Sequence, residues 1–355
     1  MRWAIRILGA VFLLTIVAVT LARRENSGWI AFSSFQDSEL GLYLMTGDGT
    51  SFRRITQGQV CPGPPLWSPD GTWIATTSSC PRLIDLFLYR PGGSLWQMVP
   101  AVSSFDWSPD GNHLVVAENP SGLRVFDLDN GNAHLVGDDF LLPQWSPDGV
   151  WIYARTGDLG ERTLHRIHMS TGQTERLLMA YNFSFVTWSP DGEQIALSLE
   201  TENRAELYVM SPDASVRTLI PLGIQFDALS DVHWSPGGEW IAFTARKDYD
   251  QNVYWVRPDG RDFGLLSEVV RDAYQVSWSP DGKWVLFVGV SDGPQSIFRL
   301  RSDGSILDNL TQKQLYGGVG SPQYAPVSGL DWRPLWLIIA SFSAILLSMM
   351  RRSRP

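Results

Sequence analysis

The chain has 355 residues, of which 44% are hydrophobic, 12% aromatic and 18% charged, a composition that supports a buried core and excludes an intrinsically disordered protein. Acidic residues outnumber basic ones by 37 to 28, and without the seven arginines that flank two apolar terminal segments the net charge is −16, which disfavours nucleic acid as a partner. Counts of 16 Trp, 32 Gly and 22 Pro predict short strands joined by tight turns, and therefore an all-β fold.

The first element in chain order is an uncharged segment over residues 7–22, which is followed at once by Arg23 and Arg24. Its apolar character and basic flanks predict a transmembrane signal-anchor within residues 1–24. A cleaved signal peptide is the alternative, because Thr20-Leu21-Ala22 is an acceptable small-residue cleavage site.

A five-residue motif then recurs along the chain. Trp-Ser-Pro-Asp-Gly begins at Trp67, Trp107, Trp145, Trp188 and Trp278, and a variant, Trp-Ser-Pro-Gly-Gly, begins at Trp234. The copies are 38 to 46 residues apart, the period expected of a four-stranded propeller blade. We label the four strands A to D, with strand A ending at the repeated tryptophan.

The ends of this repeat predict how the ring closes. Residues 29–33, 42–45 and 53–56 resemble strands B, C and D without a preceding strand A. Residues 322–326 resemble a degraded strand A with Tyr324 in place of tryptophan, and we expect them to complete the blade that begins at the N-terminus. The prediction is a seven-bladed β-propeller over residues 25–328, with six blades as the alternative.

The repeated motif itself is interpreted as structural. Proline, aspartate and glycine are the residues that a tight turn between strands A and B requires, and tryptophan is expected to pack between blades. A ring of carboxylates that binds cations is the functional alternative, but Gly237 replaces the aspartate in one copy. We therefore expect no metal site.

A second uncharged segment, residues 335–350, ends at Arg351-Arg352-Ser353-Arg354 and predicts a C-terminal transmembrane helix with a basic tail within residues 329–355. Arginines at both outer ends place both termini in the cytoplasm, so the propeller is expected at the cell membrane on its extracytoplasmic side. The chain enters at a B strand and leaves after an A strand, so both ends should depart from the face of the repeated turns.

The loops of the opposite face would then point away from the membrane, and loops on a rigid scaffold commonly carry binding residues. Aromatic and acidic side chains mix in these loops, although a solvated acidic rim is an equally good reading of any single residue. The candidate binding residues are Phe35, Asp37, Phe183, Phe226, Asp227 and Tyr249. Cys61 and Cys80 should fall beside each other on the same face, and an oxidising compartment would let them form a disulfide.

These repeats resemble the WD-like propeller repeats of the TolB-type family, which share the Trp-Ser-Pro-Asp-Gly turn, an Ile-Ala-Phe strand such as residues 30–32 and a Leu-Tyr-x-Met strand such as residues 207–210. The resemblance covers roughly residues 29–326 and implies a module that binds a protein partner or a cell-envelope component. The chain departs from the periplasmic members in having no separate N-terminal α/β domain and in having an apolar segment at each end.

We expect a protein that is not an enzyme and that has no cofactor. The same repeats form the gating propellers of prolyl-oligopeptidase-type peptidases, but this chain has no room for the hydrolase domain that such enzymes need. The alternative is a carbohydrate- or peptide-processing enzyme with its site in the central channel. Its candidate residues each precede a repeated tryptophan: Asp106, Gln144, Thr187, His233 and Ser277. A structural spacer between the two terminal helices is a third possibility.

Overall fold

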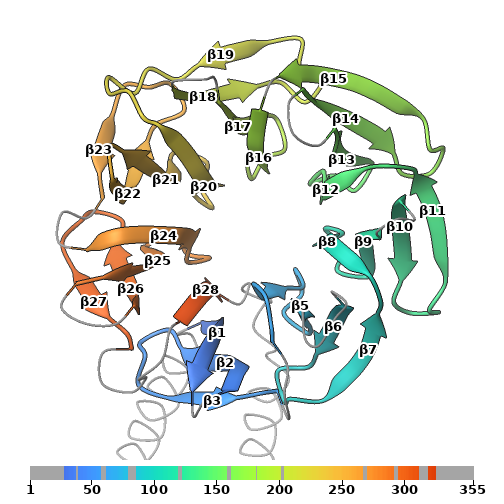
Figure 1. The fold of residues 1–355 in the computed structure, drawn as a ribbon, viewed down its shortest axis with the longest axis horizontal. Helices are drawn as coiled ribbons and strands as arrows, with labels where there is room; N and C mark the ends of the chain where they lie inside the picture. Colours follow the sequence, from blue (N-terminus) through green and yellow to red (C-terminus); the bar gives the residue numbers. More distant parts are fainter. Residues whose placement is uncertain are drawn as a thin grey trace, which may run out of the picture.

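The computed structural model describes residues 28–36, 39–56, 61–78, 85–118, 122–157, 161–180, 182–200, 204–266, 270–291, 295–311 and 319–324. Seven antiparallel sheets of four strands each are arranged around a central axis, like the blades of a propeller (Figure 1). The all-β class and the count of seven blades are confirmed, and the six-bladed alternative is wrong.

Each blade runs from an inner strand A at the channel to an outer strand D at the rim. Blade 1 contains β4 (Leu66–Trp67), β5 (Ile74–Ser78), β6 (Asp85–Tyr89) and β7 (Leu95–Val99). Blade 2 contains β8 (Val102–Trp107), β9 (His113–Glu118), β10 (Gly122–Asp127) and β11 (Ala133–Gly137). Blade 3 contains β12 (Leu141–Trp145), β13 (Trp151–Thr156), β14 (Arg162–His168) and β15 (Thr174–Ala180).

The remaining blades follow the same order until the ring closes. Blade 4 contains β16 (Asn182–Trp188), β17 (Ile195–Glu200), β18 (Ala205–Met210) and β19 (Arg217–Leu219). Blade 5 contains β20 (Ala228–Trp234), β21 (Ile241–Lys247), β22 (Asp250–Val256) and β23 (Phe263–Leu265). Blade 6 contains β24 (Arg271–Trp278), β25 (Trp284–Val290), β26 (Ser296–Arg301) and β27 (Leu307–Asn309). Blade 7 contains β28 (Val319–Tyr324), β1 (Trp29–Gln36), β2 (Glu39–Thr46) and β3 (Phe52–Arg54).

Blade 7 joins the two ends of the described chain. Strand β28 pairs with β1 in antiparallel register, with Ile30 opposite Tyr324, and the two lie side by side in Figure 1. The predicted closure is therefore confirmed, and the inner strand begins at Val319 rather than at residue 322. Since Trp29 and Tyr324 lie at the same end of this blade as the repeated turns, both chain ends leave from the turn face.

The predicted terminal helices, within residues 1–24 and 329–355, lie outside the described residues. In the part of the chain that the structure describes, none of the elements is a helix with the length and hydrophobicity needed to cross a membrane.

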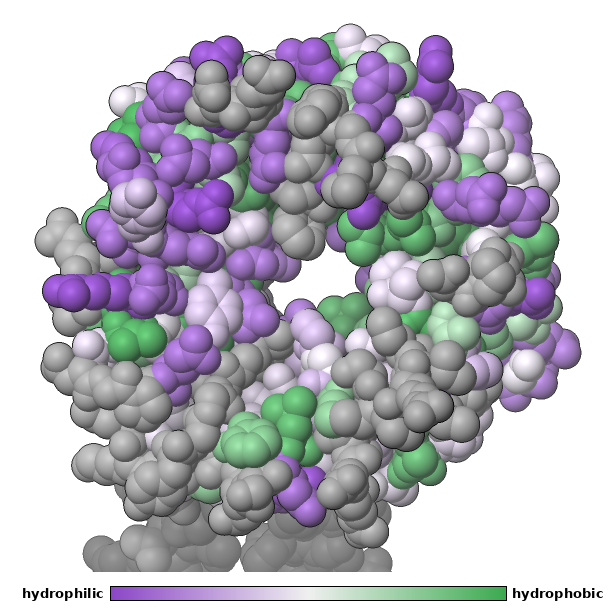
Figure 2. Space-filling model, in the orientation of Figure 1, coloured by the Kyte–Doolittle hydropathy of each residue, from purple (hydrophilic) through white to green (hydrophobic). Residues whose placement is uncertain are grey.

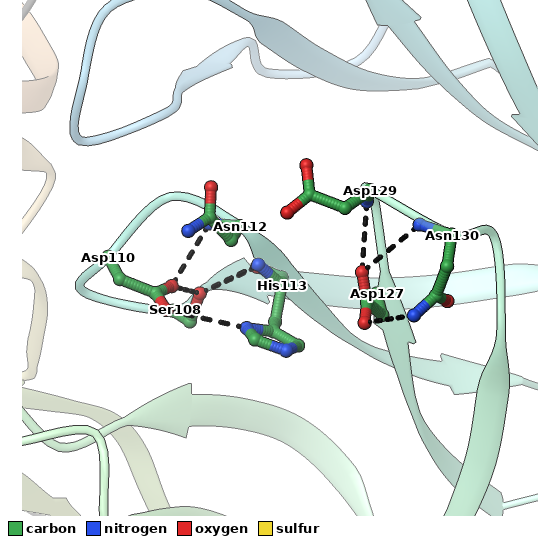
Figure 3. Close-up of polar contacts among 7 residues, drawn as sticks. All are labelled: Ser108, Asp110, Asn112, His113, Asp127, Asp129 and Asn130. Carbon is green, nitrogen blue, oxygen red and sulfur yellow. Dashed lines mark hydrogen bonds and ion pairs between the residues drawn. The ribbon is translucent and has the colours of Figure 1, made fainter.

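The repeated turn is held by its own side chains. In blade 2, the hydroxyl of Ser108 donates a 2.5 Å hydrogen bond to the Asp110 carboxylate, which also accepts the backbone N–H of Asn112 at 3.0 Å (Figure 3). Gly111 has φ 74°, a conformation that costs glycine little. The carboxylate therefore satisfies the hydrogen-bond donors of the turn in place of water. The prediction that this aspartate stabilises the turn is confirmed for this blade.

The hydrophobic core is distributed between the blades rather than gathered at one centre. Clusters of buried side chains join neighbouring blades, such as Leu207 of blade 4 with Phe243 of blade 5. The repeated Trp67, Trp107 and Trp145 are buried at 4–6% exposure, as predicted for residues that pack between sheets. Because each cluster belongs to two blades, a blade is stabilised mainly by its neighbours.

Candidate functional site

The inner strands are joined by hydrogen bonds around the channel. The residue before each repeated tryptophan reaches forward in two blades: Asp106 accepts the backbone N–H of Trp145 at 2.8 Å, and Ser277 donates to the carbonyl of Pro322 at 3.2 Å. The tryptophan itself reaches back in three blades. Its indole N–H donates to a backbone carbonyl of the previous blade, that of the residue just before the repeated tryptophan there. The pairs are Trp107 to Leu66, Trp234 to Thr187 and Trp278 to His233.

Two of these channel residues have perturbed acid–base properties. Burial raises the pKa of Asp106 from 3.8 to about 7, although backbone N–H groups of Trp145 and Trp107 oppose the shift. Desolvation by the surrounding channel wall also lowers the pKa of His233, although the residue is exposed to solvent, and the negative charge of Asp231 opposes that shift. The two residues belong to blades 2 and 5 of the ring, and the structure gives no contact between them.

Several inner strands contain a β-bulge, which changes the direction of their side chains in the half of the strand nearer the loops. The register of β12 shifts between Leu141 and Gln144, and Leu142 within this bulge has φ 49°. The backbone N–H of Leu142 donates to the Ser104 hydroxyl of blade 2 at 3.1 Å, so a contact with the neighbouring blade holds the strained residue in place. The bulge leaves the Leu142 side chain 43% exposed, and Figure 2 shows hydrophobic residues beside β12 at the open central channel.

A cavity of about 150 Å³ lies beside this bulge, between blades 3 and 4, on the side of the inner strands away from the repeated turns. Its walls come from the inner strands of blades 2, 3 and 4 and from β13 and β14 of blade 3. The lining residues are Ser104, Phe105, Leu142, Pro143, Gln144, Tyr153, Arg155, Leu164, Phe183 and Val186. A second cavity, of about 270 Å³, lies at the rim of blade 4 between β18 and the segment that follows β19, and includes Arg204 and Ile224.

The predicted binding residues are not all at the surface. Tyr249, at 96% exposure, and Phe35, at 48%, stand at the tips of the β21–β22 and β1–β2 hairpins, and Asp227 is also exposed. Asp37 lies outside the described residues. That these three act in binding stays a prediction, but their positions suit it.

Phe226 and Phe183 correct the prediction, because both were expected to be exposed and both are buried. Phe226 has 0% exposure and lies in an aromatic cluster with Phe243, Tyr254 and Phe263. Phe183 has 2% exposure and forms part of the inter-blade cavity wall. Both lie where the chain turns inward to start an inner strand. Each phenylalanine ring is therefore packed between blades and shielded from solvent.

Only one cysteine of the predicted pair, Cys61, lies among the described residues. Cys61 is disulfide-bonded, while Cys80, the other cysteine of the chain, lies outside the described residues. The backbone N–H of Cys61 donates to the Ser78 hydroxyl at 3.3 Å, which places it at the loop end of β5. The pairing of Cys61 with Cys80 stays a prediction.

Acidic residues of the described turns accept hydrogen bonds from groups of their own turn. In the second turn of blade 2, Asp127 accepts hydrogen bonds from the backbone and side chain of Asn130 and from the backbone of Asp129 (Figure 3). Similar local bonds lower the pKa of Asp213 to about 2. Across the described residues no three His, Cys, Asp or Glu side chains are grouped as metal ligands.

One sequence pattern needs the structure to interpret it. Residues 289–293, Gly-Val-Ser-Asp-Gly, fit the Gly-x-Ser-x-Gly pattern of a hydrolase nucleophile. That nucleophile sits on a sharp turn between a strand and a helix. Here Gly289 pairs with Ser296 at the end of β25, and the next described element is strand β26, so among the described residues no helix follows the pattern.

Comparison with known proteins agrees with this architecture. Residues 180–328 match the family model described as TolB beta propeller domain. The repeats within residues 180–328 are therefore of the TolB type. An uncharacterized protein from Agrobacterium fabrum is 30% identical over 139 residues, which are 33% of this chain and 47% of that relative. The chain thus spans about half the length of this curated relative.

Two solved structures show the fold. TolB from Acinetobacter baumannii is similar with a TM-score of 0.52 at 14% identity, over 84% of this chain and 83% of that protein. A prolyl endopeptidase gives a TM-score of 0.64 at 13% identity, over 83% of this chain but 49% of the peptidase. At these identities the likeness concerns the propeller and carries no activity with it.

Proposed function

We propose that this chain is a membrane-anchored, extracytoplasmic TolB-type propeller that binds a protein partner of the cell envelope through its loop face. The loop face is the side of the disc that carries the β1–β2 and β21–β22 hairpins, opposite the repeated turns. The observation that carries the proposal is that both chain ends leave from the turn face, which keeps the loop face free for a partner.

The chemistry of the loop face supports a binding role. Tyr249 and Phe35 present aromatic rings at hairpin tips, and such rings are frequent anchors in protein interfaces because they bury much area at small entropic cost. The two hairpins belong to blades 5 and 7, so a partner that touches both would span the rim of the channel. A rigid ring of seven blades would present these anchors with little loss of entropy on binding.

The enzyme alternative has less support. The peptidase that shares this fold is about twice as long as the region of likeness, so the comparison matches the propeller and leaves about half of that enzyme without a counterpart. Of the five candidate channel residues, Asp106 and Ser277 use their side chains to connect neighbouring blades. These hydrogen bonds explain the two side chains by a structural role in joining neighbouring blades.

Photo-crosslinking in intact cells would test the binding face. A photoreactive phenylalanine replaces Phe35 or Tyr249 on the loop face, and matched controls replace Val216 and Ile306, which are 62% and 40% exposed in turns of the opposite face. We expect one discrete cross-linked partner from the loop-face positions and none of that size from the controls. The same partner captured from both faces, or none from the loop face, would contradict the proposed role.

Protease protection tests the location separately. A tag is placed at each terminus, and protease is added outside intact spheroplasts. Digestion of the propeller with both tags protected supports an extracytoplasmic propeller with cytoplasmic ends. Protection of the propeller would instead place it in the cytoplasm, where thiols are kept reduced, and this would conflict with the disulfide of Cys61.

A further inference from the structure

We propose that the turn-face edge of the disc where blades 7 and 1 meet docks against an anionic lipid surface. This edge, called the blade 7–1 patch, contains the side chains of Trp29, Arg53, Arg90, Leu95 and Trp96. The inference rests on the proposed membrane anchor and deepens it, since it names the part of the propeller that contacts lipid and the lipid charge that is recognised.

The turn between the third and fourth strands of blade 1 lacks a carboxylate that the same turn has in blade 5. In blade 5, Asp259 lies two residues after Arg257, and its Oδ1 is 3.9 Å from the guanidinium Nε. In blade 1, the residue two positions after Arg90 is Gly92. The two turns are equivalent, because in each the next glycine donates its N–H to the arginine carbonyl at 2.8 Å. Arg90 therefore lacks the acidic partner that its counterpart has.

The patch holds two exposed arginines, Arg53 and Arg90, and neither has a carboxylate within 4.0 Å among the described residues. The Arg90 guanidinium lies over the indole of Trp73, 3.9 Å from the ring centroid. Arg53 belongs to blade 7 and donates a 2.6 Å hydrogen bond to the carbonyl of Pro91, the residue after Arg90. Both cations thus belong to one junction between blades, and no described acidic group pairs with either of them.

Apolar side chains are exposed beside these cations. Leu95 is 53% and Trp96 46% exposed, and Trp96 packs against Trp73 with 5.1 Å between ring centroids. The pairing of β6 with β7 shifts at Trp96, and such a bulge changes the direction of a side chain, so two successive residues of one strand are both exposed. Trp29, 39% exposed, adds a second indole on the blade 7 side. Exposed indoles beside cations are typical of protein surfaces at the headgroup level of a bilayer.

The position of the patch relative to the chain end supports a lipid contact. Trp29 follows Gly28, the first described residue, and only residues 23–27 separate Gly28 from the apolar segment at residues 7–22. A fully extended stretch of that length spans about 20 Å at most. With the apolar segment in the bilayer, as proposed, the turn-face end of β1 is held close to the membrane surface. Blade 1 is the next blade of the ring, and β3 and β7 follow one another along the rim (Figure 1).

Phosphate is the anion that suits this patch. A guanidinium forms paired hydrogen bonds with phosphate oxygens, and basic side chains near a membrane are attracted by anionic lipids. The turn carboxylates of the same two blades, Asp48 and Asp70, accept hydrogen bonds from the backbone N–H groups of Thr50 and Thr72 in their own turns. The two arginines are therefore left to bind lipid phosphate, with the indoles placed among the headgroups.

Photo-crosslinking of the full-length chain in lipid nanodiscs tests the contact. A photoreactive phenylalanine replaces Leu95, which leaves both arginines and both exposed indoles in place. A second chain carries it instead of Val216, an exposed turn-face residue of blade 4, across the ring from the patch. In discs of phosphatidylglycerol we expect a phospholipid adduct from position 95 and little from position 216. In discs of phosphatidylcholine, which has no net charge, the adduct from position 95 should fall by about fivefold or more.

Gly92→Asp supplies the carboxylate that blade 1 lacks. Apart from its chain neighbours, no described atom lies within 4 Å of the place that the new Cβ would occupy, and the φ of Gly92 is outside the left-handed region, so the turn should not be strained. The carboxylate should pair with Arg90 as Asp259 pairs with Arg257, and lower the lipid adduct from position 95 about fivefold, the effect of removing one basic residue from an anionic surface. Val216→Asp adds the same charge to the turn face at blade 4 and should leave the adduct as in the parent chain. Thermal melting checks that both variants fold.

The proposal is overturned if position 95 gives no more phospholipid adduct than position 216, if the adduct is equal in the two lipids, or if Gly92→Asp leaves it unchanged. A protein adduct from position 95 in intact cells, without a lipid adduct, would also overturn it and assign the patch to a protein partner. Failure of the proposed function has a different signature. If protease protection supports the anchor while position 95 gives no lipid adduct, the patch assignment falls and the anchor stands. If the terminal tags are not protected, the anchor is refuted and the patch assignment falls with it.

Discussion

Asp106 gives this propeller a pH-dependent stability that a single substitution should remove. Burial raises the pKa of its carboxyl group from 3.8 to about 7. Between these two pH values the carboxyl is protonated in the folded chain and ionised in the unfolded chain. Stability must therefore fall as pH rises from about 4 to about 7, and remain low above. Asp106→Asn keeps an oxygen that can accept the Trp145 N–H and removes the titration.

The magnitude follows from the shift. A pKa difference of about 3 units corresponds to about 4 kcal/mol between the two protonation states. Over the window from pH 5 to pH 8 the wild-type chain should lose about 2–3 kcal/mol of unfolding free energy through this group alone. Since other groups titrate equally in both chains, Asp106→Asn should gain about that amount relative to wild type between pH 5 and pH 8.

Urea denaturation of both full-length chains, followed by tryptophan fluorescence at pH 5 and pH 8, measures the difference. Ser277→Ala is the control, because it removes another hydrogen bond between inner strands without removing a titrating group, and its effect should be equal at the two pH values. If Asp106→Asn also shifts stability equally at both, the carboxyl is not protonated in the folded state and the account of its burial is wrong.

Three further changes test the fold. Gly237→Asp should stabilise the chain by about 1 kcal/mol, because it supplies the turn carboxylate that Asp191 provides in blade 4; an unchanged urea midpoint would contradict this. Trp234→Phe should cost about 1 kcal/mol more than Trp188→Phe, since only the former loses an indole bond that the described residues show; equal costs in denaturation would refute the role of that bond. A chain ending after residue 318 lacks β28 and should unfold in more than one step and be cleaved faster in blade 7 than a chain ending after residue 328; identical melting and proteolysis would show that closure by β28 is unimportant.

The sequence by itself determined the architecture. Trp-Ser-Pro-Asp-Gly encodes a local turn whose bonds, such as those of Ser108 and Asp110, form within five residues, so each copy predicts its own blade. The position of Tyr324 in the same period predicted that the last strand completes the blade that begins at the N-terminus, blade 7, which the register with Ile30 confirms. Loop tips that project from hairpins, such as Tyr249, were equally predictable, because a hairpin tip has no neighbour to cover it.

Only the tertiary structure decided what lies between blades. Phe226 and Tyr249 both occur in variable loops, yet one is fully buried and the other almost fully exposed, because the first belongs to a segment that turns inward against blade 5. The proton affinity of Asp106 depends on burial and on Trp145, which lies in the next blade. The cavity beside Gln144 is formed by three blades at once. Such features depend on how repeats far apart in the sequence pack together, and local sequence patterns carry no record of that packing.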